Sequence, residues 1–233
     1  MDIDDILQEF EESSSRRFQE TSSNICQDLI TAAMNERMAP ELLPYKATLM
    51  NQILTHISNQ QQYLLDSHEY GEMNSANGII SSDFKLQLMI IETDVERLSY
   101  TVRLYLRTRL SKINKYTLFY INKTRKEEQE EELLSSEEKD YIHQYYLLLT
   151  LLYNNCFLKK LPQILTYLDD NSGGHNMIVA PDVDQFVFVK CISETPLLLH
   201  LDDDELELVK NGVYVIKYSL IKRYLEIGDI VLI

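Results

Sequence analysis

Cysteine, glycine and histidine are scarce in this sequence, and their spacing excludes several kinds of site. Cys26, Cys156 and Cys191 are far apart and lack CxxC spacing, so we expect neither a disulfide framework nor a zinc site. The six glycines are scattered and form no phosphate-binding loop. None of the five histidines has a carboxylate or cysteine partner at motif spacing. The sequence therefore predicts no catalytic residue, no metal site, no cofactor and no enzymatic activity.

Basic residues and long apolar runs are also in short supply. The chain has 22 Lys and Arg against 37 Asp and Glu, a formal net charge of −15. This excess of acids argues against a free-standing nucleic-acid binder, because such a protein needs cations to displace counterions from phosphates. No apolar run approaches the roughly 20 residues that cross a bilayer, and the acidic N-terminus is unlike a targeting signal. We expect a cytosolic or nuclear protein that contacts DNA only locally or indirectly.

Apolar periodicity predicts helices through the first two thirds of the 233 residues. The expected helices cover 24–38, 46–65, 83–121, 136–159 and a short segment to 168. Residues 66–82 include two glycines and predict a loop. Ser135 and Glu138 have the spacing of a capping box at the start of the fourth helix. The nearly continuous apolar run from Tyr145 to Tyr153 in that helix predicts deep burial.

The character of the sequence changes after a stretch with two adjacent glycines at 169–176. Strands are predicted at 186–189, 197–201, 206–209, 213–218 and 229–233, with a helix at 220–226 that Ser219 should cap. We expect a mainly α protein, an N-terminal antiparallel helical bundle followed by a small β-rich module. The predicted organisation is a flexible N-terminal tail (1–20), a helical domain (21–168), a linker (169–175) and a β domain (176–233).

The central stretch carries apolar residues on two sides of one helix, which is typical of a helix packed between neighbours. We predict that it forms a subunit interface. One stripe and the opposite row together comprise Val95, Leu98, Val102, Tyr105, Leu106, Arg109, Ile113, Tyr100 and Leu104.

Arg109 falls inside the apolar stripe, where an unpaired charge is very costly. We therefore predict that it pairs with a carboxylate of this chain or of a partner subunit. The alternative is that the helix is locally exposed there.

Nine basic residues and no acidic one occur between Arg97 and Lys126. A possible basic contact surface consists of Arg97, Arg103, Arg107, Lys112 and Lys115. These charges could bind DNA locally, or they could neutralise acidic partners or the acidic run at 127–132. The simpler interpretation of that acidic run is a solvated linker.

The first residues form a short amphipathic pattern surrounded by acids. The pattern is too short for a stable isolated helix, so it is either a fraying end or a peptide that becomes helical in a partner's groove. The apolar anchors and acids of the predicted docking peptide are Asp4, Asp5, Ile6, Leu7 and Phe10.

Four stretches together resemble one family: NERMAPELLPY at 35–45, ETDVERLSYTVRLYLRTRLSKI at 92–113, FLKKLP at 157–162 and NMIVAPDVDQFVFVK at 176–190. They resemble the GINS complex of eukaryotic DNA replication, and among its four subunits the SLD-five type, with a fungal source. The likeness covers about residues 24–233.

The resemblance implies a non-catalytic scaffold subunit of a nuclear heterotetramer with three sister GINS subunits. GINS joins the minichromosome-maintenance ring and a RecJ-like helicase cofactor to form the replicative helicase, which initiates and elongates replication. The N-terminal DDIL motif followed by Phe10 resembles the peptide by which fungal replisome proteins dock on a trimeric replisome adaptor. Two other hypotheses stay open: a helical subunit of a kinetochore or tethering assembly, which leaves the β module unexplained, and local DNA binding by the basic central helix.

Overall fold

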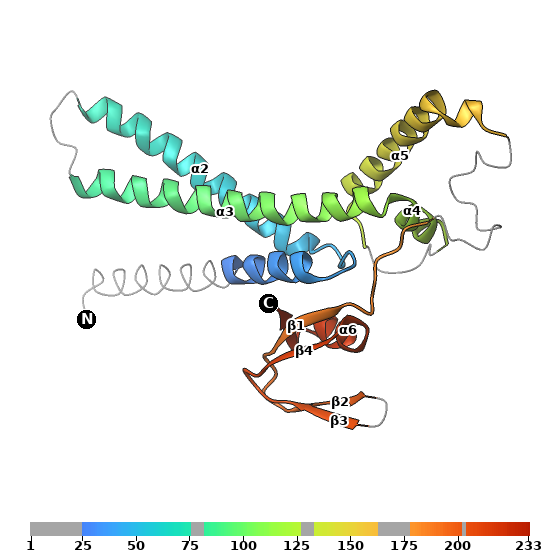
Figure 1. The fold of residues 1–233 in the computed structure, drawn as a ribbon. Helices are drawn as coiled ribbons and strands as arrows, with labels where there is room; N and C mark the ends of the chain where they lie inside the picture. The colour runs from blue at the N-terminus through green and yellow to red at the C-terminus, as the bar shows by residue number, and fades with distance from the viewer. Residues whose placement is uncertain (1–24, 76–81, 127–132, 163–177, 202–203) are drawn as a thin grey trace. The chain divides into compact units, whose positions relative to one another are not determined.

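A computed structural model describes residues 25–75, 82–126, 133–162, 178–201 and 204–233 (Figure 1). Helices make up most of the described residues as far as Lys160, and a small antiparallel β module with one helix follows. The predicted fold class, mainly α with a small C-terminal β-rich module, is confirmed. The chain divides into two compact units, Met1–Ala33 with Lys46–Tyr105, and Met34–Tyr45 with Leu106–Ile233.

The first unit is helical. Helix α2 (Ala47–Ser75) belongs to the first unit alone. The helical residues 25–38 and the long helix α3 (Ser82–Lys115) each begin in the first unit and end in the second. Helices α2 and α3 run antiparallel (Figure 1). Apolar residues spaced three or four apart are buried, as expected for the inner face of each helix. The buried side chains are Leu29, Ala33, Met50, Ile53, Ile57, Leu88, Val95, Val102 and Tyr105.

Two sequence predictions for the helices are wrong. Residues 66–75 are the last turns of α2 rather than part of a loop. The single Gly71 costs about 1 kcal/mol relative to alanine, which the good helix formers around it offset. The central stretch is also not one helix, because α3 ends at Lys115 and α4 (Thr117–Lys126) follows a turn at Tyr116. The Thr117 hydroxyl donates to the carbonyls of Ile113 and Asn114 at 2.8 and 3.0 Å, a bond of the kind that bends helices.

The helical part of the second unit has its own core around the end of α3, α4 and α5 (Ser136–Cys156), after which a 3-10 turn, η1, covers Leu158–Lys160. The core consists of Leu42, Ile113, Tyr116, Tyr120, Ile121, Leu134 and Ile142. The predicted capping box is confirmed at the start of α5. The N–H of Glu138 donates to Ser135 Oγ at 3.1 Å, and the N–H of Ser135 donates to Glu138 Oε2 at 3.1 Å.

The β module has a three-stranded antiparallel sheet in the order β4-β1-β5, built from Val213–Lys217, Phe186–Cys191 and Ile230–Leu232 (Figure 1). A hairpin of β2 (Leu197–Leu201) and β3 (Asp204–Leu208) and the helix α6 (Tyr218–Ile227) complete it. Inward residues of β1 pack with α6 residues such as Ile221 in one core. Helix α6 ends at Ile227, and Gly228 follows in the left-handed conformation with a φ of 95°, which suits glycine.

Ser219 does not cap α6, contrary to the sequence prediction. The helix starts two residues earlier than predicted, at Tyr218, and its N-cap position is Lys217, without a side-chain cap bond. The Ser219 hydroxyl instead donates to Asp184 Oδ1 at 3.3 Å.

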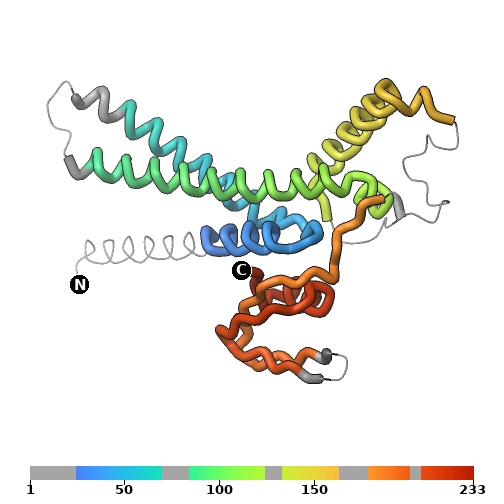
Figure 2. Tube along the Cα trace, in the orientation of Figure 1, coloured from blue at the N-terminus to red at the C-terminus, as the bar shows by residue number. Residues whose placement is uncertain are grey.

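Some predictions fall on residues outside the described ranges, which Figure 2 draws in grey. They are the N-terminal docking peptide, the acidic run at 127–132, and the short helix to residue 168 with the linker after it. The domain boundaries proposed from the sequence stay a prediction. None of the helices in the described part of the chain combines the length and apolarity that a membrane span needs.

Candidate interaction surfaces

Arg109 of α3 lies at the centre of a buried ionic cluster and is fully shielded from solvent. Its Nε donates to Glu138 Oε1 at 2.7 Å and its Nη2 to Glu138 Oε2 at 2.9 Å, a bidentate pair. Its Nη1 donates to Glu36 Oε2 at 3.0 Å. Both carboxylates belong to this chain, so the structure gives Arg109 the intramolecular partners that its helical position requires.

The remaining capacity of the Arg109 guanidinium is also used. Nη1 donates to the carbonyl of Leu43 at 2.7 Å and Nη2 to that of Leu133 at 2.8 Å, while the Tyr45 ring lies 5.2 Å from the guanidinium carbon. Burial raises the pKa of the Tyr45 hydroxyl, and the charge of Glu138 raises it further. A guanidinium so fully bonded is held rigidly and has no donor left for a substrate.

Lys112 belongs to this cluster, so its prediction as part of an open basic surface is wrong. Its Nζ donates to Glu36 Oε1 at 2.7 Å, to the carbonyl of Glu41 at 2.7 Å, and to the carbonyl of Glu36. Burial lowers the pKa of the Lys112 ammonium even though Glu36 favours its charged form. Lys112 lies one turn after Arg109 on the same face of α3, so both side chains reach the carboxylate of Glu36.

The segment that supplies Glu36 also binds the β module within the second unit. Asn35 Oδ1 accepts a bond from the N–H of Leu232 at 2.9 Å. Glu41 Oε1 accepts from the Tyr218 hydroxyl at 3.0 Å and pairs with Lys222 Nζ at 2.7 Å, and Ala39 is part of the module's core. The segment 35–45 therefore connects the Arg109 cluster to the β module by side-chain bonds, which is a structural role.

The residues predicted as a subunit interface divide into two groups in the structure. The chain itself buries Val95, Val102, Tyr105, Arg109 and Ile113, because they lie on the inner stripe of α3. Leu98, Leu104 and Leu106 are half-buried, and Tyr100 is 64% exposed. Only this second group has surface left for another chain.

The predicted basic surface is open at four of its five positions. Arg97, Arg103, Arg107 and Lys115 are exposed, and Arg103 Nε donates to the carbonyl of Ser99 at 3.0 Å. Lys115 Nζ lies 5.0 Å from the centre of the Tyr116 ring.

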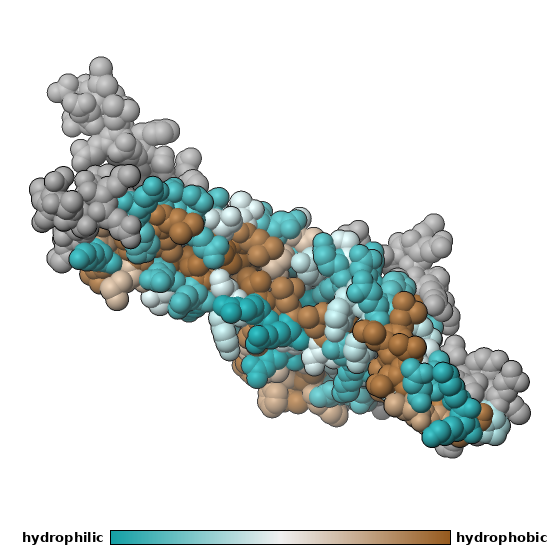
Figure 3. Space-filling view, turned by 90° about the horizontal axis from the view of Figure 1, so that it is seen from above, coloured by the Kyte–Doolittle hydropathy of each residue, from teal (hydrophilic) through white to brown (hydrophobic). Residues whose placement is uncertain are grey.

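Helix α5 carries an apolar surface that the sequence analysis predicts to be buried. Leu147, Leu148, Leu151 and Leu152 are between 56% and 66% exposed, and a hydrophobic patch lies over the α5 region in Figure 3. The four leucines form two adjacent rows on one side of the helix, since the members of each row are four residues apart. The prediction of deep burial is therefore wrong for these four leucines, because the described residues of this chain do not cover them.

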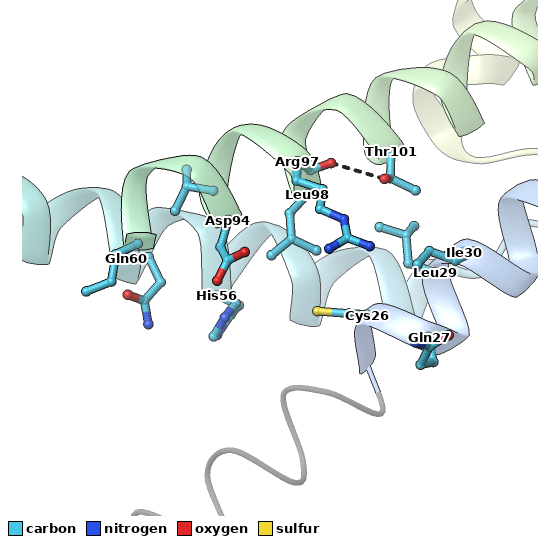
Figure 4. Close-up of a pocket in the computed structure, with 12 residues that line it drawn as sticks. Cys26, Gln27, Leu29, Ile30, His56, Gln60, Asp94, Arg97, Leu98 and Thr101 are labelled. Atoms are coloured by element: carbon cyan, nitrogen blue, oxygen red, sulfur yellow. Dashed lines mark hydrogen bonds between the residues drawn. The ribbon is translucent and has the colours of Figure 1, made fainter. Parts of the chain in front are cut away.

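One pocket of about 350 Å³ lies between residues 26–30, α2 and α3 in the first unit (Figure 4). Cys26, His56, Asp94 and Arg97 are among the side chains that line it. Burial raises the pKa of the Cys26 thiol, and the charge of Asp94 adds to the effect, so the reactive thiolate is disfavoured. Within the described ranges, no group of three or more His, Cys, Asp or Glu residues is arranged to hold a metal ion.

Two family models match the chain. Residues 57–157 match the model described as "GINS complex protein helical bundle domain", and residues 181–233 match "DNA replication complex GINS protein SLD5 C-terminus". The first covers α3, α4 and α5 with most of α2, and the second covers the sheet and α6.

Several fungal proteins carrying the name DNA replication complex GINS protein SLD5 are similar to the chain over most of its length. The protein from Debaryomyces hansenii is 59% identical, with 100% of this chain and 98% of the relative covered. That from Yarrowia lipolytica is 32% identical, with coverage of 100% and 85%. That from Saccharomyces cerevisiae is 33% identical, with coverage of 88% and 79%.

Proposed function

The chain belongs to the SLD5 family of GINS complex proteins, and on that premise we propose that it is a non-catalytic scaffold subunit of a GINS heterotetramer. In this function it assembles with three sister subunits in the nucleus and takes part in the initiation and elongation of DNA replication. Its contribution is to present surfaces to other proteins.

The exposed leucine face of α5 is the observation that carries the proposal. Fully burying a leucine side chain stabilises a protein by roughly 1.5–3 kcal/mol, so four exposed leucines on one helix favour association strongly. A contiguous apolar face of this kind marks a protein interaction site. Leu98, Tyr100, Leu104 and Leu106 of α3 supply further accessible surface.

We extend the proposal to the larger assembly that the family resemblance implies. The heterotetramer joins the minichromosome-maintenance ring and a RecJ-like helicase cofactor as part of the replicative helicase. The peptide with Asp4, Asp5, Ile6, Leu7 and Phe10 docks on the trimeric replisome adaptor through its apolar side chains. The buried residues of the predicted interface, such as Val102 and Ile113, support this function indirectly because they fix the position of α3.

The mass of a purified complex tests the assembly proposal. The chain is co-expressed with the three sister subunits from its own source, and the product is measured by light scattering and native mass spectrometry. We expect a stable 1:1:1:1 assembly and poor solubility of the chain expressed alone. A soluble monomer would contradict the scaffold proposal. A chain that stays poorly soluble and does not bind the sister subunits would favour a kinetochore or tethering assembly.

Local DNA binding is a second candidate function because Arg97, Arg103 and Arg107 are exposed. Binding by phosphate contacts would weaken steeply with salt. We would measure the salt slope for the complex and for the double variant Arg103→Glu with Arg107→Glu, with Lys159→Glu and Lys160→Glu in η1 as the control pair. A slope reduced only in the first variant supports direct contact, and equal slopes exclude it.

A further inference from the structure

The sheet of the β module has an apolar outer face opposite the side that packs on α6. Side chains in β1 alternate, with Val187, Val189 and Cys191 buried in the core and the residues between them exposed. An antiparallel sheet with one solvated face normally carries polar residues there. Here the exposed positions of β1 and β4 include Phe186, Phe188, Val213 and Val215, which are between 55% and 62% exposed.

The strand register places these side chains next to one another. Phe188 pairs with Val215 of β4, and on its other side its carbonyl accepts a bond from the N–H of Ile233 at 3.1 Å. Lys190 lies between Val213 and Val231, and Lys217 pairs with Phe186. Cross-strand neighbours on one face lie about 5 Å apart, so these residues form one continuous surface, which we call the outer sheet face.

The charge of the outer sheet face is opposite to that of the chain. Its outward positions carry Lys190 and Lys217 and no acid, in a protein of net charge −15. Neither lysine has an ion-pair partner in the part of the chain that the structure describes. By contrast, Lys210 and Lys222 of the same module pair with Glu194 and Glu41.

We propose that the outer sheet face is a docking surface for an acidic, amphipathic segment of a partner protein. The apolar side chains of such a segment cover the phenylalanines and valines, and its carboxylates pair with the two lysines. A second copy of this chain is a poor occupant, because a symmetric contact would bring the lysines of both copies onto one apolar interface. Nucleic acid is also a poor occupant, since two cations release few counterions.

A designed peptide tests the proposal on the full chain in its co-expressed complex. The probe is a fluorescent amphipathic peptide with Leu and Phe on one face and Glu on the other, and its counterpart has Gln in place of every Glu. We expect saturable binding of the acidic peptide, weakened about tenfold or more by Lys190→Glu with Lys217→Glu and by Phe186→Ser with Phe188→Ser. The Gln peptide should bind the unaltered complex about as weakly as the acidic peptide binds the lysine variant.

Matched control variants separate this surface from nonspecific attraction. Val209→Ser removes an exposed apolar side chain outside the three strands, and Lys210→Glu reverses an exposed charge elsewhere in the module. The proposal is overturned if these controls weaken binding as much as the face variants do, if the acidic peptide does not bind, or if a single-stranded oligonucleotide competes equally well. Because all the altered residues belong to the β module, such a failure leaves the mass measurement of the proposed heterotetramer unaffected.

Discussion

Arg109 and Glu138 form a bidentate ion pair across 29 positions of the sequence, with nitrogen to oxygen distances of 2.7 and 2.9 Å. The carboxylate of Glu138 serves two bonded groups at once. Its Oε2 accepts from Arg109 Nη2 and also from the backbone N–H of Ser135, which caps α5. The start of α5 is thus fixed to α3 by the same side chain that closes its first turn.

Replacing Arg109 by methionine should destabilise the second unit strongly. The variant leaves Glu36 and Glu138 buried without their cation, and breaking a buried pair in this way costs about 3–5 kcal/mol. Amide hydrogen exchange in the co-expressed complex should show a loss of protection in 35–45 and at the start of α5. The control Arg103→Met removes an exposed arginine and should leave protection nearly unchanged. Equal protection in both variants would show that the cluster contributes nothing to stability.

Removing the two halves of the capping box should have unequal effects. Ser135→Ala removes one cap bond and should cost about 1 kcal/mol. Glu138→Ala removes the reciprocal bond and also one of the two carboxylates of Arg109, so its cost should be clearly larger. Hydrogen exchange at the first turn of α5 measures both, with Asp140→Ala, which removes an exposed acid of the next turn, as control. If Glu138→Ala were no worse than Ser135→Ala, the ion pair would have no net stabilising effect.

Tyr120 should make stability fall at high pH. Its hydroxyl accepts a bond from the N–H of Leu42 at 2.8 Å, and burial raises the pKa of this phenol well above its ordinary value of about 10. Above pH 10 the unfolded chain therefore ionises this tyrosine while the folded chain does not, so the free energy of unfolding decreases as the pH rises.

The comparison with Tyr120→Phe isolates this effect. At pH 7 the variant should be less stable by about 1–3 kcal/mol, because the N–H of Leu42 loses its acceptor. Above pH 10 the difference should shrink by up to about 1.4 kcal/mol per pH unit, as measured from urea unfolding followed by helical circular dichroism. A difference that stays constant from about pH 9 to about pH 11, one unit either side of the ordinary phenol pKa of about 10, would contradict the assignment.

The sequence predicts this fold well where a feature follows from the spacing of nearby residues. Arg109 could be identified as a paired residue from helical position alone, and the cap at Ser135 from its spacing. The partner Glu36 could not be identified, because it is 73 positions away and local periodicity carries no information on such contacts. Lys112 was misplaced for the same reason.

The apolar run of α5 shows a second limit. Periodicity indicates that Leu148 and its neighbours must leave water, but it does not distinguish burial by the same chain from burial by another. The sequence therefore predicted a core where the structure has an accessible surface. The prediction of a loop after Leu65 was wrong for a different reason. The local propensity for a loop around Gly71 was overridden by the continuation of α2.

The N-terminal peptide should bind the replisome adaptor through its apolar side chains. A labelled peptide of residues 1–19 is titrated with the purified trimeric adaptor, and Ile6→Ala with Leu7→Ala should weaken binding about a hundredfold, since two apolar anchors are truncated. Replacing Ser13 and Ser14 by alanine is the control and should change little. Unchanged affinity in the Ile6 and Leu7 variant would exclude docking by this motif.

Aspartates in the α5 leucine face should prevent assembly without unfolding the helix. Leu148 and Leu152 are exposed in the isolated chain, so Leu148→Asp with Leu152→Asp removes no core packing there. In an interface, the same two charges would be buried without partners, at a cost of several kcal/mol each. Sister subunits should therefore fail to co-purify with this variant, while a solubility-tagged form of the chain keeps its helical circular dichroism.

A control on the same helix distinguishes lost burial from added charge. Ser136→Asp with His143→Asp introduces two acids at exposed polar positions of α5 that precede the leucine face and should leave the four-chain mass unchanged. If both variants dissociate the complex, charge repulsion along α5 explains the result and the leucines are not the contact. If neither does, the leucine face stays in solvent within the assembly, and the accessible residues of α3, Tyr100 above all, become the surface on which the sister subunits must pack.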